Sequence, residues 1–76
     1  MKKYKIGQVL KSIEPAVPVY DMELATTIDY INLRDKVIVL EHIIRHTGSN
    51  YIKILFGGNR VGFVFNYEDR WEEVTI

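Results

Sequence analysis

The sequence has no cysteine, only two prolines and no surplus of charge of either sign. Without cysteine there is neither a disulfide framework nor a thiolate metal site. Ten acidic residues balance ten Lys and Arg, whereas nonspecific nucleic-acid binding usually needs a surplus of basic residues. Polar residues interrupt every apolar run before it reaches signal-peptide or membrane-spanning length. We therefore expect a cytoplasmic protein with no membrane partner.

The residues that are present predict one small packed β-domain. The chain has 76 residues, of which 47% are apolar and 26% are charged, so it forms one domain near the lower size limit for folding alone. Segments rich in β-branched and aromatic residues alternate with Gly, Pro and Asn clusters, a pattern typical of short strands. The predicted strands fall within residues 3–13, 17–20, 37–45, 51–56, 61–65 and 71–76. Five to six short strands predict an all-β barrel, which removes exposed sheet edges by closing on itself.

Residues 21–31 form the least regular part of the sequence. Asp21 is a suitable cap for a short helix, but the β-branched and aromatic residues of 26–31 favour extended structure. We interpret this segment as a long, partly extended, hairpin-like loop. Asp21, Glu23 and Asp29 give it an acidic character.

Residues 51–65 form a predicted β-hairpin, because two apolar runs flank Gly-Gly-Asn. A two-residue turn would place Ile54 opposite Phe63. A three-residue turn at Gly57–Asn59 would instead place Ile54 opposite Gly62 and gather Tyr51, Phe63 and Phe65 on the other face. Asn59 tolerates the left-handed conformation that the last residue of such a loop adopts. Local chemistry alone does not choose between the two registers.

Several segments resemble SH3 domains in both order and spacing. Pro18-Val19-Tyr20-Asp21-Met22 resembles the Ala-Leu-Tyr-Asp-Tyr opening of these domains. Residues 31–40, Ile-Asn-Leu-Arg-Asp-Lys-Val-Ile-Val-Leu, resemble Leu-x-Phe-x-x-Gly-Asp-x-Ile-x-Val-Leu, and residues 62–65, Gly-Phe-Val-Phe, resemble Gly-Tyr-Ile-Pro. The chain thus looks like a divergent SH3-like barrel, of the eukaryotic or the bacterial kind.

This resemblance implies a single SH3-like domain, with an extra N-terminal strand in residues 1–14 and the barrel in residues 15–76. It implies that the acidic loop is of the RT type and that the hairpin has the three-residue turn, because that register pairs Ile54 with Gly62 as the family does. It also implies that Tyr20, Tyr51 and Phe65 lie near the family's peptide groove. Met22 and Phe65 replace the groove Tyr and Pro, so ordinary proline-rich ligands are not expected.

Neither catalysis nor metal binding is predicted. His42 and His46 are four residues apart, but their β-branched surroundings favour a strand, which separates them by roughly 13 Å. We therefore expect surface or loop histidines. Gly57 and its neighbour lie in a strand-to-strand turn, without the helix N-terminus that makes a glycine-rich loop bind phosphate. Paired acids at 68–69 and 72–73 are expected to be solvated. We predict no catalytic residue, no metal ligand and no cofactor.

The aromatic residues carry the functional hypothesis. One Trp, five Tyr and three Phe are more than so small a barrel can bury fully, even with Trp71 and Phe56 in the core. Exposed aromatic rings rimmed by charge are typical of protein interfaces. The candidate partner-binding residues are Tyr20, Asp21, Glu23, Asp29, Tyr30, Tyr51, Phe65 and Tyr67. They predict a non-catalytic module that binds another protein or peptide bearing a basic residue, as an adaptor or a small inhibitor, including one encoded by a phage.

Two alternatives belong to other classes. A nucleic-acid-binding barrel would use stacking tyrosines and a set of basic side chains. These are Lys2, Lys3, Lys5, Lys11, Arg34, Lys36 and Arg60. A structural protein would instead form a homo-oligomer, so that its mass in solution would exceed 8.9 kDa.

Overall fold

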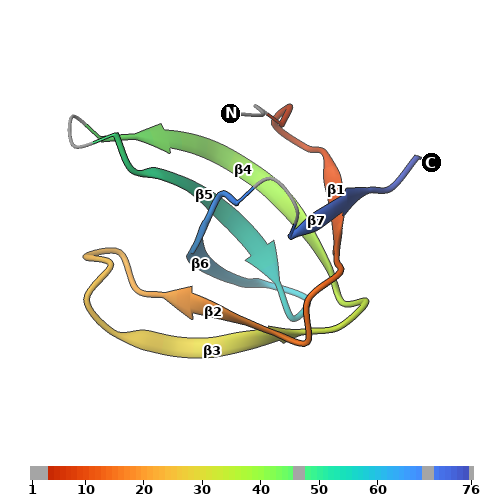
Figure 1. Cartoon of the computed structure of the whole chain (residues 1–76), viewed down its shortest axis with the longest axis horizontal. Helices are drawn as coiled ribbons and strands as arrows, with labels where there is room; N and C mark the ends of the chain where they lie inside the picture. Colours follow the sequence, from red (N-terminus) through yellow and green to blue (C-terminus); the bar gives the residue numbers. More distant parts are fainter. Residues whose placement is uncertain (1–3, 46–47, 68–69, 76) are drawn as a thin grey trace.

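The computed structural model describes residues 4–45, 48–67 and 70–75, and they confirm the all-β class. These residues form seven strands of one antiparallel sheet, which curls strongly into an open half-barrel (Figure 1). The expectation of a barrel that closes on itself was therefore wrong, because β3 and β7 remain edge strands. The strands are β1 (Val9–Ser12), β2 (Ala16–Tyr20), β3 (Thr27–Asn32), β4 (Lys36–Ile44), β5 (Asn50–Phe56), β6 (Arg60–Phe65) and β7 (Trp71–Glu73). Their order across the sheet is β3-β2-β6-β5-β4-β1-β7. No helix in the described ranges is long and apolar enough to cross a membrane.

The strand that exceeds the predicted five to six is β3, within the segment interpreted as a loop. It pairs with β2 along its length, with Val17 opposite Ile31 and Val19 opposite Asp29. Asp21 caps no helix; its Oδ1 accepts hydrogen bonds from the backbone N–H of Ala25, at 3.1 Å, and of Thr26. The chain therefore reverses tightly between β2 and β3, and the β-branched residues continue as a strand.

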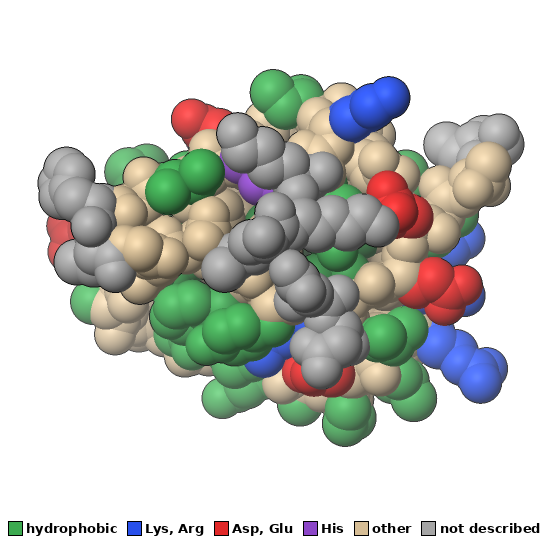
Figure 2. All heavy atoms as spheres, turned by 45° about the horizontal axis from the view of Figure 1, so that its top comes forward, with side chains coloured by type: hydrophobic (Ala, Val, Ile, Leu, Met, Phe, Trp, Pro, Cys, Tyr) green, Lys and Arg blue, Asp and Glu red, His purple; other side chains and the backbone are tan. Residues whose placement is uncertain are grey.

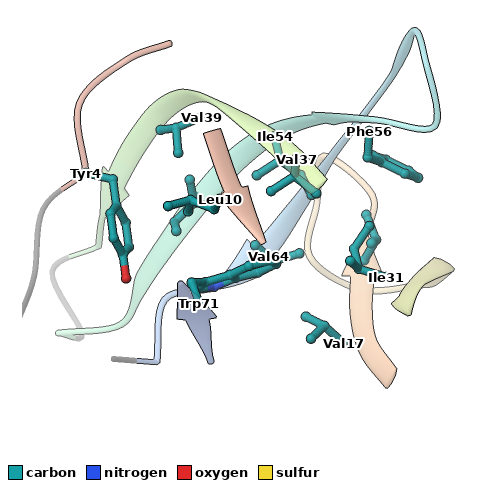
Figure 3. Close-up of a cluster of buried hydrophobic side chains, with 12 residues drawn as sticks. Tyr4, Leu10, Val17, Ile31, Val37, Val39, Ile54, Phe56, Val64 and Trp71 are labelled. Atoms are coloured by element: carbon teal, nitrogen blue, oxygen red, sulfur yellow. The ribbon is translucent and has the colours of Figure 1, made fainter. Parts of the chain in front are cut away.

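The inner face of the curled sheet holds the hydrophobic core (Figure 3). Strand alternation sends every second side chain of β2, β4, β5 and β6 inward. Trp71 and Phe56 are each only 5% exposed, which confirms their prediction as core residues. The buried cluster comprises Tyr4, Leu10, Val17, Val19, Ile31, Val37, Val39, Ile52, Ile54, Phe56, Val64 and Trp71.

The central hairpin has the three-residue turn. Ile54 lies opposite Gly62, and Tyr51 lies opposite Phe65. The left-handed conformations fall on Gly57 (φ 58°) and Gly58 (φ 92°) and not on Asn59, although an asparagine tolerates one. Two adjacent glycines meet the strain of the turn at lower cost than an asparagine does. This register turns Phe63 and Phe65 outward.

The N-terminal segment is part of the sheet. β1 pairs with β4 on one side and β7 on the other, so β7 depends on β1 for its place. Upstream of β1, the Gly7 N–H donates to the Val39 carbonyl at 2.7 Å, and the Val39 N–H donates to the Gln8 carbonyl at 2.9 Å. Nearer the chain start, the Tyr4 N–H donates to Nε2 of His42 at 2.6 Å. Backbone and side-chain hydrogen bonds therefore attach the segment before β1 to β4.

Candidate functional site

Aromatic side chains gather on the outer face of β2, β6 and β5. Gly62 faces Val19 and Val64 belongs to the core cluster, so Phe63 and Phe65 at the alternate positions of β6 lie on the other face, where Phe63 is still only 8% exposed. Across the strands, Tyr51 lies opposite Phe65 and Tyr20 lies opposite Phe63. Because opposite residues of an antiparallel pair share a face, these four rings line the same side of the sheet.

Phe65 is the centre of this group. Its ring centroid lies 4.6 Å from that of Tyr51 in a tilted arrangement. Tyr20 meets it edge-on at 5.3 Å, and Tyr67 stacks on it at 5.7 Å with an interplanar angle of 9°. Offset-stacked and edge-to-face pairs are the favourable aromatic geometries. We call Tyr20, Tyr51, Phe65 and Tyr67 the Phe65 cluster.

Access to the cluster is unequal. Tyr67 is 52% exposed, whereas Tyr51 is only 8% exposed; Tyr20 and Phe65 are half-buried. Tyr51 is therefore not the surface ring that the sequence predicts, because Phe65 packs on one side of it and the Arg45 guanidinium lies 5.6 Å from its centroid. What a partner could touch is Tyr67 with the open sides of Phe65 and Tyr20. Elsewhere on the surface, apolar side chains also emerge between the charged ones (Figure 2).

Two arginines border the cluster, and sequence reasoning missed both. Besides Arg45, the Arg70 guanidinium lies 4.7 Å from the Tyr67 ring centroid. Arg70 Nε also donates to Glu14 Oε2 at 3.1 Å, which fixes the side chain in place. Each exposed cation–π contact is worth about 0.5–1 kcal/mol. Both contacts are local: the Arg70 N–H donates to the Tyr67 carbonyl three residues earlier, and Arg45 lies two residues beyond Ile43, the partner of Tyr51 across the β4–β5 hairpin.

The predicted acidic residues do not surround the cluster. Asp21 adjoins Tyr20 at the end of β2, and Glu23 is exposed in the following turn. Asp29 lies on β3 in an ion pair with Arg60. Tyr30, also on β3, is 54% exposed and makes no ring contact with the cluster among the described residues. The structure thus gathers four of the eight predicted residues and leaves Asp29 and Tyr30 apart from them.

Of the two histidines, the structure describes only His42. His42 lies on β4, where Nε2 accepts the Tyr4 N–H and the two rings stack at 6.1 Å. It therefore has a structural contact that the prediction of a surface or loop histidine did not include. His46 lies outside the described residues, as do Glu68 and Asp69. Within the described ranges, no group of three or more His, Asp and Glu side chains could hold a metal ion.

The pKa of Asp29 is shifted by its hydrogen-bond partners. A hydrogen bond from the Tyr30 N–H and then the Arg60 guanidinium hold the pKa of Asp29 below its usual value. A carboxylate with a lowered folded-state pKa stabilises the fold above its ordinary pKa, and this stabilisation is lost as pH falls through the lowered pKa.

We expect an NMR titration of the Asp29 carboxyl carbon to show this depressed pKa. Arg60→Gln should raise the pKa only partly, since the backbone donor, which has the larger effect, remains. Titration of Asp29 at the ordinary aspartate value in the unmodified chain would contradict both contacts.

Comparison with protein-family models, with curated proteins and with solved structures finds no match to this chain.

Proposed function

We propose that this chain is a non-catalytic, SH3-like module that binds another protein through the Phe65 cluster. The observation that carries this proposal is a set of rings gathered around Phe65: Tyr20, Tyr51 and Tyr67 each contact it, and Tyr67 is more than half exposed. Tyrosines offer a large contact area at a low cost in conformational entropy, and they are enriched at binding hot spots. A rigid sheet beneath them reduces the cost of ordering on binding further.

Three features support the SH3-like assignment. β4, β5 and β6 form a meander with a tight last turn, and Ile54 pairs with Gly62 in that turn's register. The β2–β3 hairpin occupies the position in the sequence where an RT-type loop is expected. The aromatic residues that the resemblance assigns to a groove, Tyr20, Tyr51 and Phe65, are in contact.

The charges around the cluster suggest what the partner carries. Asp21 and Glu23 follow Tyr20 at one end, where they would attract a basic side chain. Arg45 and Arg70 lie over the rings of Tyr51 and Tyr67 at the other end. The best partner would therefore be an extended peptide with an aromatic or aliphatic anchor and a Lys or Arg on the side of Tyr20.

Selection from a random peptide library, followed by anisotropy titration of the selected peptides, tests this proposal. Tyr67→Ala should weaken binding about tenfold, as expected for an accessible hot-spot ring, and should leave the melting temperature nearly unchanged. Chemical shifts should move at Tyr20, Phe65 and Tyr67 when peptide is added.

Leu33→Ala is the matched control, because Leu33 is 51% exposed but lies in the β3–β4 turn. It should bind like the unmodified chain. Equal affinities of the Tyr67 and Leu33 variants, or shifts confined to other faces, would rule out the Phe65 cluster as the binding surface.

A second candidate is binding of single-stranded nucleic acid, favoured by the two arginines over tyrosine rings. The basic residues predicted for this role are less suited to it: Lys11 is paired with Glu72 at 3.7 Å, and Arg60 is paired with Asp29. Affinity for an oligonucleotide that falls steeply with added salt would favour this candidate. Peptide binding that is indifferent to salt would favour the first.

A further inference from the structure

The open half-barrel leaves two strands, β3 and β7, at the edges of its sheet (Figure 1). β7 has only three residues, two of them Glu72 and Glu73, and a short charged edge resists pairing with another chain. β3 has six residues, and its Ile28 and Tyr30 are 42% and 54% exposed. Such an edge would be expected to pair with a further strand unless something blocks it.

Pro18 on β2 shows which N–H groups of β3 point away from β2. Opposite residues in an antiparallel pair exchange both of their hydrogen bonds or neither. Pro18 has no N–H and lies opposite Tyr30, so this pair exchanges none; the same holds for Asn32, two residues further on. The N–H groups of Tyr30 and Asn32 therefore point away from β2, toward the free edge.

Two carboxylates accept hydrogen bonds from these N–H groups. The Tyr30 N–H donates to Asp29 Oδ1 at 2.7 Å, and the Asn32 N–H donates to Asp35 Oδ2 at 3.1 Å. The Asn32 carbonyl accepts from the Asp35 N–H at 3.0 Å. Arg60 holds Asp29 by an ion pair and lies over the ring of Phe56. The free edge is thus capped by Asp29, which belongs to β3 itself, and by Asp35, which follows β3 in the chain.

We propose that the free edge of β3 is a latent strand-pairing surface for a second copy of this chain, and that Asp29 and Asp35 keep it closed. Two β3 strands related by a two-fold axis at Tyr30 would be antiparallel, with Tyr30 opposite its symmetry mate and Asn32 facing residue 28 of the other copy. This arrangement is self-complementary, because each outward N–H meets a carbonyl of the other strand. A second copy is the fitting occupant, since the same edge supplies both sides.

A hollow borders the capped edge. It has a volume of about 410 Å³ and runs along β3 to the start of β4 and the β5–β6 turn. Its lining residues are Asp29, Tyr30, Ile31, Asn32, Asp35, Lys36, Phe56, Gly57 and Arg60. Both capping aspartates line this hollow, so replacing them changes one place on the surface.

Sedimentation equilibrium of matched double variants tests the proposal. Asp29→Ala with Asp35→Ala removes both acceptors, and its mass should rise with concentration from 8.9 kDa toward twice that value. Asp29→Asn with Asp35→Asn keeps an oxygen acceptor at each position and should stay monomeric, like the unmodified chain. A monomeric Ala variant would overturn the proposal. An Asn variant that dimerises equally would also overturn it, because charge rather than capping would then close the edge.

Amide hydrogen exchange tests the two caps even if the double Ala variant does not fold. In the unmodified chain, the Tyr30 and Asn32 amides should exchange more slowly than free peptide amides although they lie on a free edge. In the single variant Asp35→Ala, exchange should accelerate at Asn32 and stay slow at Tyr30. Unprotected exchange of both amides in the unmodified chain would show that the caps do not exist in solution.

Discussion

Replacing Gly62 with alanine is expected to lower the free energy of unfolding by about 2–3 kcal/mol, the usual cost of overpacking a well-packed core. A Cβ added at Gly62 would lie 2.3 Å from Cγ1 of Val19, 3.2 Å from Cε1 of Phe56 and 3.4 Å from the Tyr20 carbonyl oxygen. Val19 is fully buried and β-branched, so its side chain has little freedom to turn away. Its neighbours on both strands must shift instead.

This loss is large for so small a domain. A chain of this length has a total stability of roughly 4–11 kcal/mol. Urea denaturation should therefore show a clear fall in the transition midpoint with an unchanged slope. The fall should be accompanied by loss of order where β2 meets β6, because Gly62 is next to Phe63, which pairs with Tyr20 across those strands.

The double variant Val19→Ala with Gly62→Ala identifies the cause. Val19→Ala alone leaves a cavity and should destabilise the chain, but the alanine methyl at Gly62 should partly fill that cavity. The double variant should therefore be more stable than the sum of the single changes predicts, by roughly 1 kcal/mol or more. Strict additivity of the two changes would contradict a clash between these two positions.

The contact of Gly62 also explains how far the hairpin could be predicted. Residues 51–65 were clearly a hairpin from their pattern, but Gly-Gly-Asn allowed two registers. The three-residue turn is required because only glycine at position 62 fits against Val19. Val19 belongs to another strand that is distant in the sequence, so the turn chemistry alone could not reveal this requirement. The likeness to SH3 domains indicated the correct register.

The failure to predict β3 as a strand has a different reason. On β3, only Ile31 is buried, while Thr27 and Ile28 are exposed, so the alternation typical of a half-buried strand is weak. The inward position opposite Val19 is taken by Asp29. Its side chain is 39% exposed and forms an ion pair with Arg60. An acidic residue at an inward position looks like loop sequence until its partner on β6 is known.

The candidate site was predicted in its rings but not in its surroundings. The aromatic content predicted Tyr20, Tyr30, Tyr51, Phe65 and Tyr67 as candidate surface rings, and the resemblance to SH3 domains implied that Tyr20, Tyr51 and Phe65 lie near one groove. The structure brings these three together with Tyr67 and leaves Tyr30 apart. The burial of Tyr51 depends on neighbours from other strands. Arg45 and Arg70 were missed although they are close in the sequence to the rings that they cover: Arg70 is three residues after Tyr67, and Arg45 is near Tyr51 across the β4–β5 hairpin.

Tyr4→Ala is expected to lower the free energy of unfolding by about 3 kcal/mol, as large-to-small changes at buried aromatic residues do. Tyr4 is only 5% exposed and belongs to the buried core cluster (Figure 3). It comes before the first strand, yet its ring stacks on His42 and its N–H donates to Nε2 of that residue. The ring therefore covers one end of the core, and its removal exposes the side chains beneath.

Ile6→Ala is the matched control in the same segment. Ile6 is 75% exposed, so its truncation should change the stability by no more than about 0.5 kcal/mol. His42→Phe should fall between the two, since it keeps an aromatic ring but leaves the Tyr4 N–H without its acceptor, at a cost of about 1–3 kcal/mol. Urea midpoints of the three variants test this order. If Tyr4→Ala and Ile6→Ala proved equally mild, the segment before β1 would not be docked on β4 in solution, and the core would end at Leu10.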